Sequence, residues 1–313
     1  MWCHSKVIFI PKAGKASYLE PRSFRPISLA NYLYKALEVL AVWRVEETAL
    51  QSSPLHRRQF AFRKDHSTDQ ALTESVNVIE KAMLRGLMAI AIYIDIKGAF
   101  DNICTNAIVD SLTRRGVEEQ IVSWYRNYLT QRTCETTLGG STSKASLTRG
   151  APQGGPGSPE LSWNIPYDDL LREYNQMAAE QFGFADDTKL VITGCDFDTI
   201  MREAQKAIKV AEKWALDKGV QFCTNKTQVL FFTRGLWRPQ RKLKLYGKEL
   251  PWSSDTKYLG VTIDDKLTFR KHIQNRIASA KRKLMILRNA LARTWAPNHP
   301  FANGHIPALF VQL

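Results

Sequence analysis

The stretch YIDIKGAFDNI, residues Tyr93 to Ile103, decides the fold of this chain. The eight residues before Asp95, Leu87 to Ile94, are all apolar, and Gly86 precedes them. A run of this length, bounded by a glycine, favours a strand buried on both faces of a sheet. The strand would present Asp95 at its C-terminal end.

A second acidic group follows in FADD, residues Phe184 to Asp187. The pattern from Phe182 to Thr193 predicts a β-hairpin with the tight turn Ala185-Asp186-Asp187-Thr188. If the hairpin neighbours the first strand, Asp95, Asp186 and Asp187 meet. Carboxylates fixed on rigid elements suit the two Mg²⁺ ions of nucleotidyl transfer. Taken alone, an Asp-Asp pair in a turn is more often solvated surface.

The rest of the chain alternates helical and strand patterns, which predicts a mixed fold of the α+β class. Ser67-Thr68-Asp69-Gln70 fits a capping box that opens a helix running to Arg85. Further helices are expected before Gly116, from Val117 to Tyr128, and from Ile200 to a cap at Gly219; short strands are expected at Gln228 to Thr233 and Tyr258 to Ile263.

The last periodic segment begins at Ile273. Its apolar residues recur in steps of four and three and form one stripe, at Ile277, Ala280, Leu284, Leu287 and Leu291. The stripe spans under three heptads, so a basic helix packed on its own domain is favoured over a coiled-coil seam. After Trp295 no structure is assigned.

Composition restricts the class of protein. The 313 residues are 44% hydrophobic, which is ordinary for a chain that buries a core. No apolar run approaches the roughly 20 residues of a membrane span, and no secretory signal is present. Five widely spaced cysteines without a C-x-x-C pair are expected to be free thiols in a reducing compartment. We therefore expect an intracellular protein, nuclear or cytoplasmic, without membrane partners.

The formal charge of +14 is concentrated in the C-terminal third. Arg234 to Lys248 holds six basic residues and Lys266 to Arg288 holds eight, with no acidic residue in either. Charge gathered in this way suggests a surface that faces a polyanion, because phosphate neutralisation dominates nucleic-acid affinity. The alternative is a solvated basic face.

Seven motifs occur in order along the chain: SFRPISL (23–29), QFAFRKDHSTDQAL (59–72), YIDIKGAFDNI (93–103), GAPQGGPGSPELSWN (150–164), FADD (184–187), NKTQVLFF (225–232) and KYLGVTID (257–264). This series resembles the reverse transcriptase of non-LTR, LINE-type retrotransposons of the jockey-like group, over roughly residues 6 to 265. The resemblance implies a right-hand polymerase fold, with fingers and palm in residues 1–264 and a partial helical thumb in residues 265–313.

The resemblance also implies roles at the acidic site. Asp95 and Asp186 would hold two Mg²⁺ ions, or Mn²⁺ in their place, with Asp187 beside them as the third catalytic carboxylate and Ile96 among the metal ligands. Phe100 would contact the sugar of the incoming nucleotide and disfavour a 2′-hydroxyl. Without the family, Phe100 would be read as a core aromatic.

Further residues are implied to bind the nucleotide and the duplex. Arg63 and Lys64 would hold the triphosphate, Gln153 would border the nascent pair, and Lys226 would lie near the leaving pyrophosphate as a general acid or electrostatic partner. An ordinary surface arginine is the alternative for Arg63. Template and primer contacts would come from Arg25, Gly154, Arg241, Lys242, Lys244, Arg270 and Lys271.

Two departures from the family pattern fall in the glycine-rich loop and its helix. Gly157 stands where an apolar residue is usual, with an extra proline at Pro156, so the loop is expected to be looser. Ser158 and Pro159 fit an N-cap and first helical position. Pro166, seven residues further on, is expected to kink or end the helix, at a cost of about 3 kcal/mol.

These patterns together predict an RNA-directed DNA polymerase that extends a DNA primer on an RNA template with deoxynucleoside triphosphates. No endonuclease pattern is found in the chain, which looks like a fragment of a longer protein. The alternative is a truncated or repurposed element remnant that binds nucleic acid without polymerising.

Overall fold

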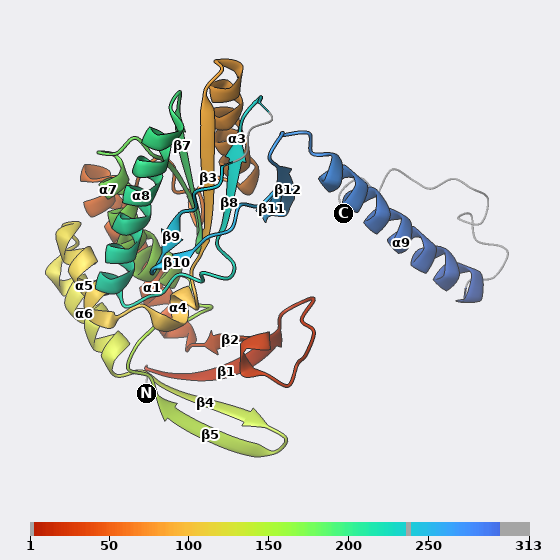
Figure 1. The fold of residues 1–313 in the computed structure, drawn as a ribbon. Helices are drawn as coiled ribbons and strands as arrows, with labels where there is room; N and C mark the ends of the chain where they lie inside the picture. Colours follow the sequence, from red (N-terminus) through yellow and green to blue (C-terminus); the bar gives the residue numbers. More distant parts are fainter. Residues whose placement is uncertain (1–2, 236–238, 295–313) are drawn as a thin grey trace.

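A four-stranded antiparallel sheet forms the centre of the molecule, in a computed structural model that describes residues 3–235 and 239–294 (Figure 1). Its strand order is β6-β7-β3-β8. The strands are β6 (Glu180–Phe184), β7 (Asp187–Gly194), β3 (Met88–Asp95) and β8 (Gln228–Phe232). The predicted buried strand and the predicted hairpin are confirmed, and they are neighbours in the sheet.

The two faces of β3 enter two separate apolar clusters, which explains why the strand is apolar throughout. Ile90, Ile92 and Ile94 belong to one cluster, and Ala89, Ala91 and Tyr93 to the other. The first lies under a layer of helices: α1 (Tyr32–Glu47), α5 (Thr105–Arg114), α6 (Glu119–Thr130), α7 (Ile165–Tyr174) and α8 (Phe197–Lys218). The second lies under α3 (Thr68–Leu84).

Local signals place the helix ends as expected. The Ser67 hydroxyl accepts a hydrogen bond from the Gln70 main-chain N–H at 3.2 Å, and Gly219 closes α8 at φ +70°. The Gln70 side chain donates to Glu74 rather than returning to Ser67, so only half of the capping box is formed.

A second sheet lies beyond the end of β3 that carries Asp95 (Figure 1). Its order is β2-β1-β4-β5, and β1 pairs antiparallel with β2 and parallel with β4. The strands are β1 (His4–Pro11), β2 (Phe24–Leu29), β4 (Thr133–Leu138) and β5 (Ser141–Ser146); the short helices η1 (Pro21–Ser23), α2 (Ala49–Ser52) and α4 (Ala99–Asn102) connect the parts.

The helix after the glycine-rich loop begins with a π turn, η2 (Pro159–Asn164), and continues directly as α7. The Ile165 N–H donates to the Glu160 carbonyl, five residues back. The expected early end at Pro166 is therefore wrong: the wide turn ends at Asn164, and Pro166 falls in the first turn of α7, which continues to Tyr174. The expected kink stays a prediction. The Ser158 side chain does not cap the helix either, and its buried hydroxyl has no hydrogen-bond partner.

The strand predicted in the C-terminal third is corrected by the structure. The segment predicted as one strand, Tyr258 to Ile263, is a hairpin of β11 (Asp255–Tyr258) and β12 (Val261–Asp264). Leu259 and Gly260 form its turn with φ of +46° and +85°, a geometry that a continuous apolar pattern hides. A two-residue pair, β9 (Lys244–Leu245) with β10 (Lys248–Glu249), precedes it.

The basic helix α9 (Arg270–Thr294) extends away from the body (Figure 1). Ile273, Ile277 and Leu284 of its apolar stripe are 53%, 50% and 53% exposed. The prediction that this helix packs on its own domain is therefore wrong for the side chains described. Leu291 and the segment after Trp295 lie outside them. Among residues 3–235 and 239–294, no helix is long and apolar enough to cross a membrane. All five cysteines are free, as predicted.

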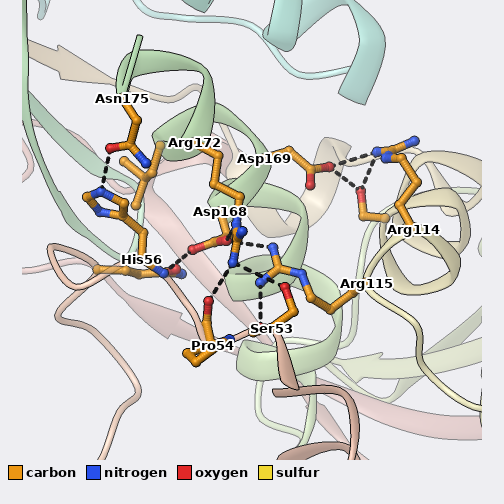
Figure 2. Close-up of polar contacts among 12 residues, drawn as sticks. Ser53, Pro54, His56, Arg114, Arg115, Asp168, Asp169, Arg172 and Asn175 are labelled. Atoms are coloured by element: carbon orange, nitrogen blue, oxygen red, sulfur yellow. Dashed lines mark hydrogen bonds and ion pairs between the residues drawn. The ribbon is translucent and has the colours of Figure 1, made fainter. Parts of the chain in front are cut away.

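A buried ion network ties α7 to the segment from Ser53 to His56 (Figure 2). The Asp168 carboxylate is fully buried and accepts from Arg115 at 2.5 Å, from Arg172 at 2.6 Å and from the His56 main-chain N–H at 2.5 Å. Phe60 N–H then donates to the Gly183 carbonyl at 2.9 Å. The network thus holds the 53–60 segment along the strand that leads to the aspartate turn.

Candidate active site

The three predicted aspartates lie at the same end of the central sheet. Asp95 on β3 and Asp187 on β7 are direct cross-strand partners. Side chains at such positions lie on the same face, with Cα atoms about 4.5 to 5.5 Å apart. Asp186 occupies the turn beside them. The turn lies one residue earlier than predicted, because Phe184 pairs with Asp187 and Ala185 and Asp186 are the two residues between the strands.

The electrostatics of this cluster are those of a site short of positive charge. Burial, followed by repulsion from Asp186 and Asp95, raises the pKa of Asp187 to about 6. Burial and the Asp95 carboxylate also raise the pKa of Asp186, although its side chain reaches the surface. A bound cation would favour the ionised forms of both groups. This excess of carboxylate is chemically suited to hard divalent cations such as Mg²⁺.

Lys226 supplies one positive charge to the cluster. Its ammonium lies 2.9 Å from Asp95 Oδ2, and this hydrogen bond raises the lysine pKa. Lys226 thus lies beside Asp95, and its role near the leaving pyrophosphate stays a prediction. Within the described residues, no three carboxylate, imidazole or thiol groups are already gathered as a metal-binding cluster. The Lys226 ammonium takes one of the Asp95 oxygens that an ion would use, and Ile96, buried beside it, has only its main chain to offer.

Phe100 lies in α4, one turn beyond Asp95, and is partly buried. Its ring stacks on Trp163 with centroids 5.4 Å apart and meets Phe62 edge-on at 6.3 Å. Gly98 is the N-cap of this helix with φ +58°, a conformation that glycine adopts at low cost because it has no Cβ. Phe100 therefore makes the core contacts that the pattern alone favours, and its contact with the sugar stays a prediction.

The glycine-rich loop, residues 150–158, packs against β2 and α1. The Gln153 carbonyl accepts from Ser28 N–H at 2.8 Å, and its buried Oε1 has no hydrogen-bond partner. Gly154 has φ +110°, and a Cβ there would meet Ile27 at 3.0 Å. The predicted looseness at Gly157 is not seen as a gap, because a Cβ at that position would meet the α1 backbone at 3.0 Å.

Other predicted nucleotide and template residues are distributed unequally. Arg25 on β2 is close enough to Asp186 that its charge opposes the rise in the pKa of that aspartate, which burial causes. Arg63 instead donates two 2.9 Å hydrogen bonds to the carbonyls of His56 and Gln59, which fixes its own loop. Lys64 is exposed beside it. The triphosphate role of Arg63 and Lys64 stays a prediction.

The two basic segments lie on different parts of the molecule. Arg241, Lys242 and Lys244 line a pocket of about 790 Å³ against α8, on the helix-covered side of the sheet. Arg241 pairs with Asp198, and Lys242 with Glu249. Arg270 and Lys271 begin α9, where Lys271 contacts Asp255 at 2.7 Å. No contact joins any of these five basic residues to Asp95, Asp186 or Asp187 among the contacts of the described residues.

Two buried residues near the site were missed from the sequence. Trp163 is fully buried and donates from its indole N–H to the carbonyl of Ala185, at 2.7 Å. Lys189 is fully buried two residues after Asp187, between the rings of Tyr93 and Tyr258, and burial lowers its pKa to about 7. The spacing of Trp163 and Tyr167, four residues apart in a helical segment, was the one available signal for the former.

Comparison with known proteins identifies the family. The family described as "Reverse transcriptase (RNA-dependent DNA polymerase)" matches residues 10–263. The chain is 27% identical over 295 residues to a 115 kDa protein in the type-1 retrotransposable element R1DM of Drosophila melanogaster, covering 93% of this chain and 27% of that protein. It is 27% identical over 280 residues to the RNA-directed DNA polymerase from mobile element jockey of the same species, covering 88% and 30%.

The chain spans under a third of the length of these relatives. Among solved structures, telomerase from Candida tropicalis in complex with a fragment of telomeric RNA matches with a TM-score of 0.60 at 15% identity, over 86% of this chain and 44% of that chain. That likeness confirms the right-hand polymerase fold, and the retrotransposon relatives confirm the resemblance drawn from the motifs. The chain belongs to the reverse transcriptase family, with non-LTR retrotransposon polymerases as its relatives.

Proposed function

We propose that this chain is the polymerase core of a non-LTR retrotransposon and transfers a nucleotidyl group from a deoxynucleoside triphosphate to the 3′-hydroxyl of a DNA primer on an RNA template. The observation that carries the proposal is the register of β3 and β7. It sets Asp95 directly opposite Asp187, next to Asp186 and within reach of the Lys226 ammonium.

Asp95, Asp186 and Asp187 would hold two Mg²⁺ ions, with Mn²⁺ as an alternative. When bound, such ions stabilise the charge that develops on a transferring phosphoryl group. The raised pKa values of Asp186 and Asp187 support this, since both groups gain from a cation. Metal binding would relieve the repulsion among these carboxylates.

The chain's own residues account for the remaining parts of the reaction. Lys226 is exposed on one side and holds Asp95 on the other, so its ammonium can shift toward the leaving pyrophosphate and neutralise charge there. The Phe100 ring, fixed against Trp163, would bear on the sugar. The orphaned Oε1 of Gln153 supports a polar contact supplied by a bound nucleotide.

Primer extension tests the proposal. The chain should extend a labelled DNA primer on an RNA template with Mg²⁺ and deoxynucleotides, and Asp186→Ala should abolish extension. Asp217→Ala changes an exposed aspartate of α8 and should leave extension intact. Equal extension by the wild type and Asp186→Ala would refute the metal site. Salt-dependent binding of the duplex without extension would instead favour the nucleic-acid-binding remnant.

A further inference from the structure

Trp163 contacts two parts of the site, the Phe100 ring and the turn that carries Asp186. It projects from the π turn, is fully buried, and touches the Phe100 ring with one face of its indole. The Tyr167 ring also stacks with the indole, nearly parallel at 5.9 Å and 13°. Its N–H reaches the Ala185 carbonyl.

The Ala185 carbonyl belongs to the strained residue of the aspartate turn. Ala185 has φ +54°, a conformation that costs an L-residue with a Cβ free energy. Such a conformation persists only when the surroundings hold it. The 2.7 Å bond from the Trp163 indole is one such restraint, and it acts on the peptide that directly precedes Asp186.

A second restraint comes from the same helix. The Tyr167 hydroxyl lies 2.7 Å from Thr188 Oγ1, directly after Asp187. The strand before the turn closes on the same ring, because a Cβ at Gly183 would be 2.4 Å from Tyr167. Trp163 and Tyr167 therefore hold the aspartate turn from both of its ends.

Resting on the proposed function, we propose that Trp163 is a positioning residue: its N–H fixes the Ala185-Asp186 turn for metal binding, while its ring fixes Phe100. The two effects are separable. Trp163→Phe keeps an aromatic ring in the stack and removes only the N–H donor. The turn would then lose its restraint, whereas Phe100 would keep a ring to pack against.

The fold supplies a matched control in Trp214. This residue is also buried, belongs to the same aromatic cluster, and donates its indole N–H to a main-chain carbonyl, that of Pro166, at 3.0 Å. It contacts neither the aspartate turn nor Phe100 in the contacts described. Trp214→Phe therefore keeps an aromatic ring against Trp163 and Tyr167 and removes a comparable hydrogen bond that does not end on the aspartate turn.

Hydrogen exchange tests the structural half of the proposal without any polymerase activity. Exchange of the amides from Phe184 to Thr188 should be at least tenfold faster in Trp163→Phe than in the wild type. In Trp214→Phe these amides should exchange within twofold of the wild type. Equal protection of the turn in both variants would overturn the proposal, whether or not the chain polymerises.

Steady-state primer extension tests the functional half. Trp163→Phe should lower kcat by about 10- to 100-fold and raise the Mg²⁺ concentration for half-maximal rate, with the KM for the nucleotide within threefold of wild type. Trp214→Phe should leave kcat and the Mg²⁺ concentration for half-maximal rate within threefold of the wild type. The same loss of rate in both variants would assign Trp163 a merely structural role. A wild type that does not extend primers would refute the proposed function and leave the exchange result to decide the positioning role.

Discussion

Asp187→Asn should stabilise the folded chain at neutral pH, because it removes one carboxylate from a cluster that repels itself. The pKa of Asp187 is raised from 3.8 to about 6 by burial and by Asp186 and Asp95. At about 1.4 kcal/mol per pKa unit the full effect would be about 3 kcal/mol. The side chain is partly exposed, so solvent screening reduces the expected gain to about 1 to 2 kcal/mol.

The sign of the pH dependence follows from the direction of the shift. A carboxyl group whose pKa is higher in the folded state favours folding while it is protonated, below its unfolded pKa. That contribution is lost as the pH rises through the folded pKa. Wild-type stability should therefore fall between about pH 4 and pH 6 relative to Asp187→Asn, and the two proteins should be similar near pH 4.

Urea unfolding of both proteins at pH 4 and pH 7.5, without divalent cations, measures this difference. Asp217→Asn is the control, since this exposed aspartate on α8 should give no comparable gain at pH 7.5. Adding Mg²⁺ at pH 7.5 should stabilise the wild type more than Asp187→Asn. A gain that is the same at both pH values, or a loss of stability at pH 7.5, would refute the electrostatic reasoning.

Three further predictions concern residues around the site. Asp168→Asn leaves the buried Arg115 without its charge partner and should cost about 3 to 5 kcal/mol in urea unfolding; a cost below 1 kcal/mol would contradict the role of the network. Gly183→Ala sets a Cβ against Tyr167 and should lower stability by about 1 to 3 kcal/mol, and an unchanged Tm would show that the ring can move away. Lys226→Met should reduce single-nucleotide incorporation at least about tenfold with stability within about 1 kcal/mol, because its ion pair is exposed; full activity would exclude it from the site.

The elements with a strong single period were predictable from sequence. The apolar run ending at Asp95 and the spacing from Ile200 to Ala215 gave the central strand and α8, and Gly219 gave its cap. Each depends on local pattern and on burial of one face or two, which the residues themselves encode.

What the sequence did not yield depends on hydrogen bonds between distant or shifted partners. The opposition of Asp95 and Asp187 needs the register of two strands, which neither strand specifies alone. The π turn at Pro159–Asn164 changes one hydrogen-bond step and leaves composition unaltered. The direction of α9 depends on what packs against its apolar stripe. Ile277 in this stripe is half exposed, so the described residues do not cover it.

The π turn has a consequence for how this gene can change. An extra residue in one helical turn rotates everything after it by about 100° relative to everything before it. Trp163 stands inside that turn and Tyr167 just after it, and both are aimed at the aspartate hairpin. A deletion of one codon here would turn the two side chains apart while preserving nearly every amino acid. A one-residue deletion in this segment is therefore expected to disturb the site more than a conservative substitution does.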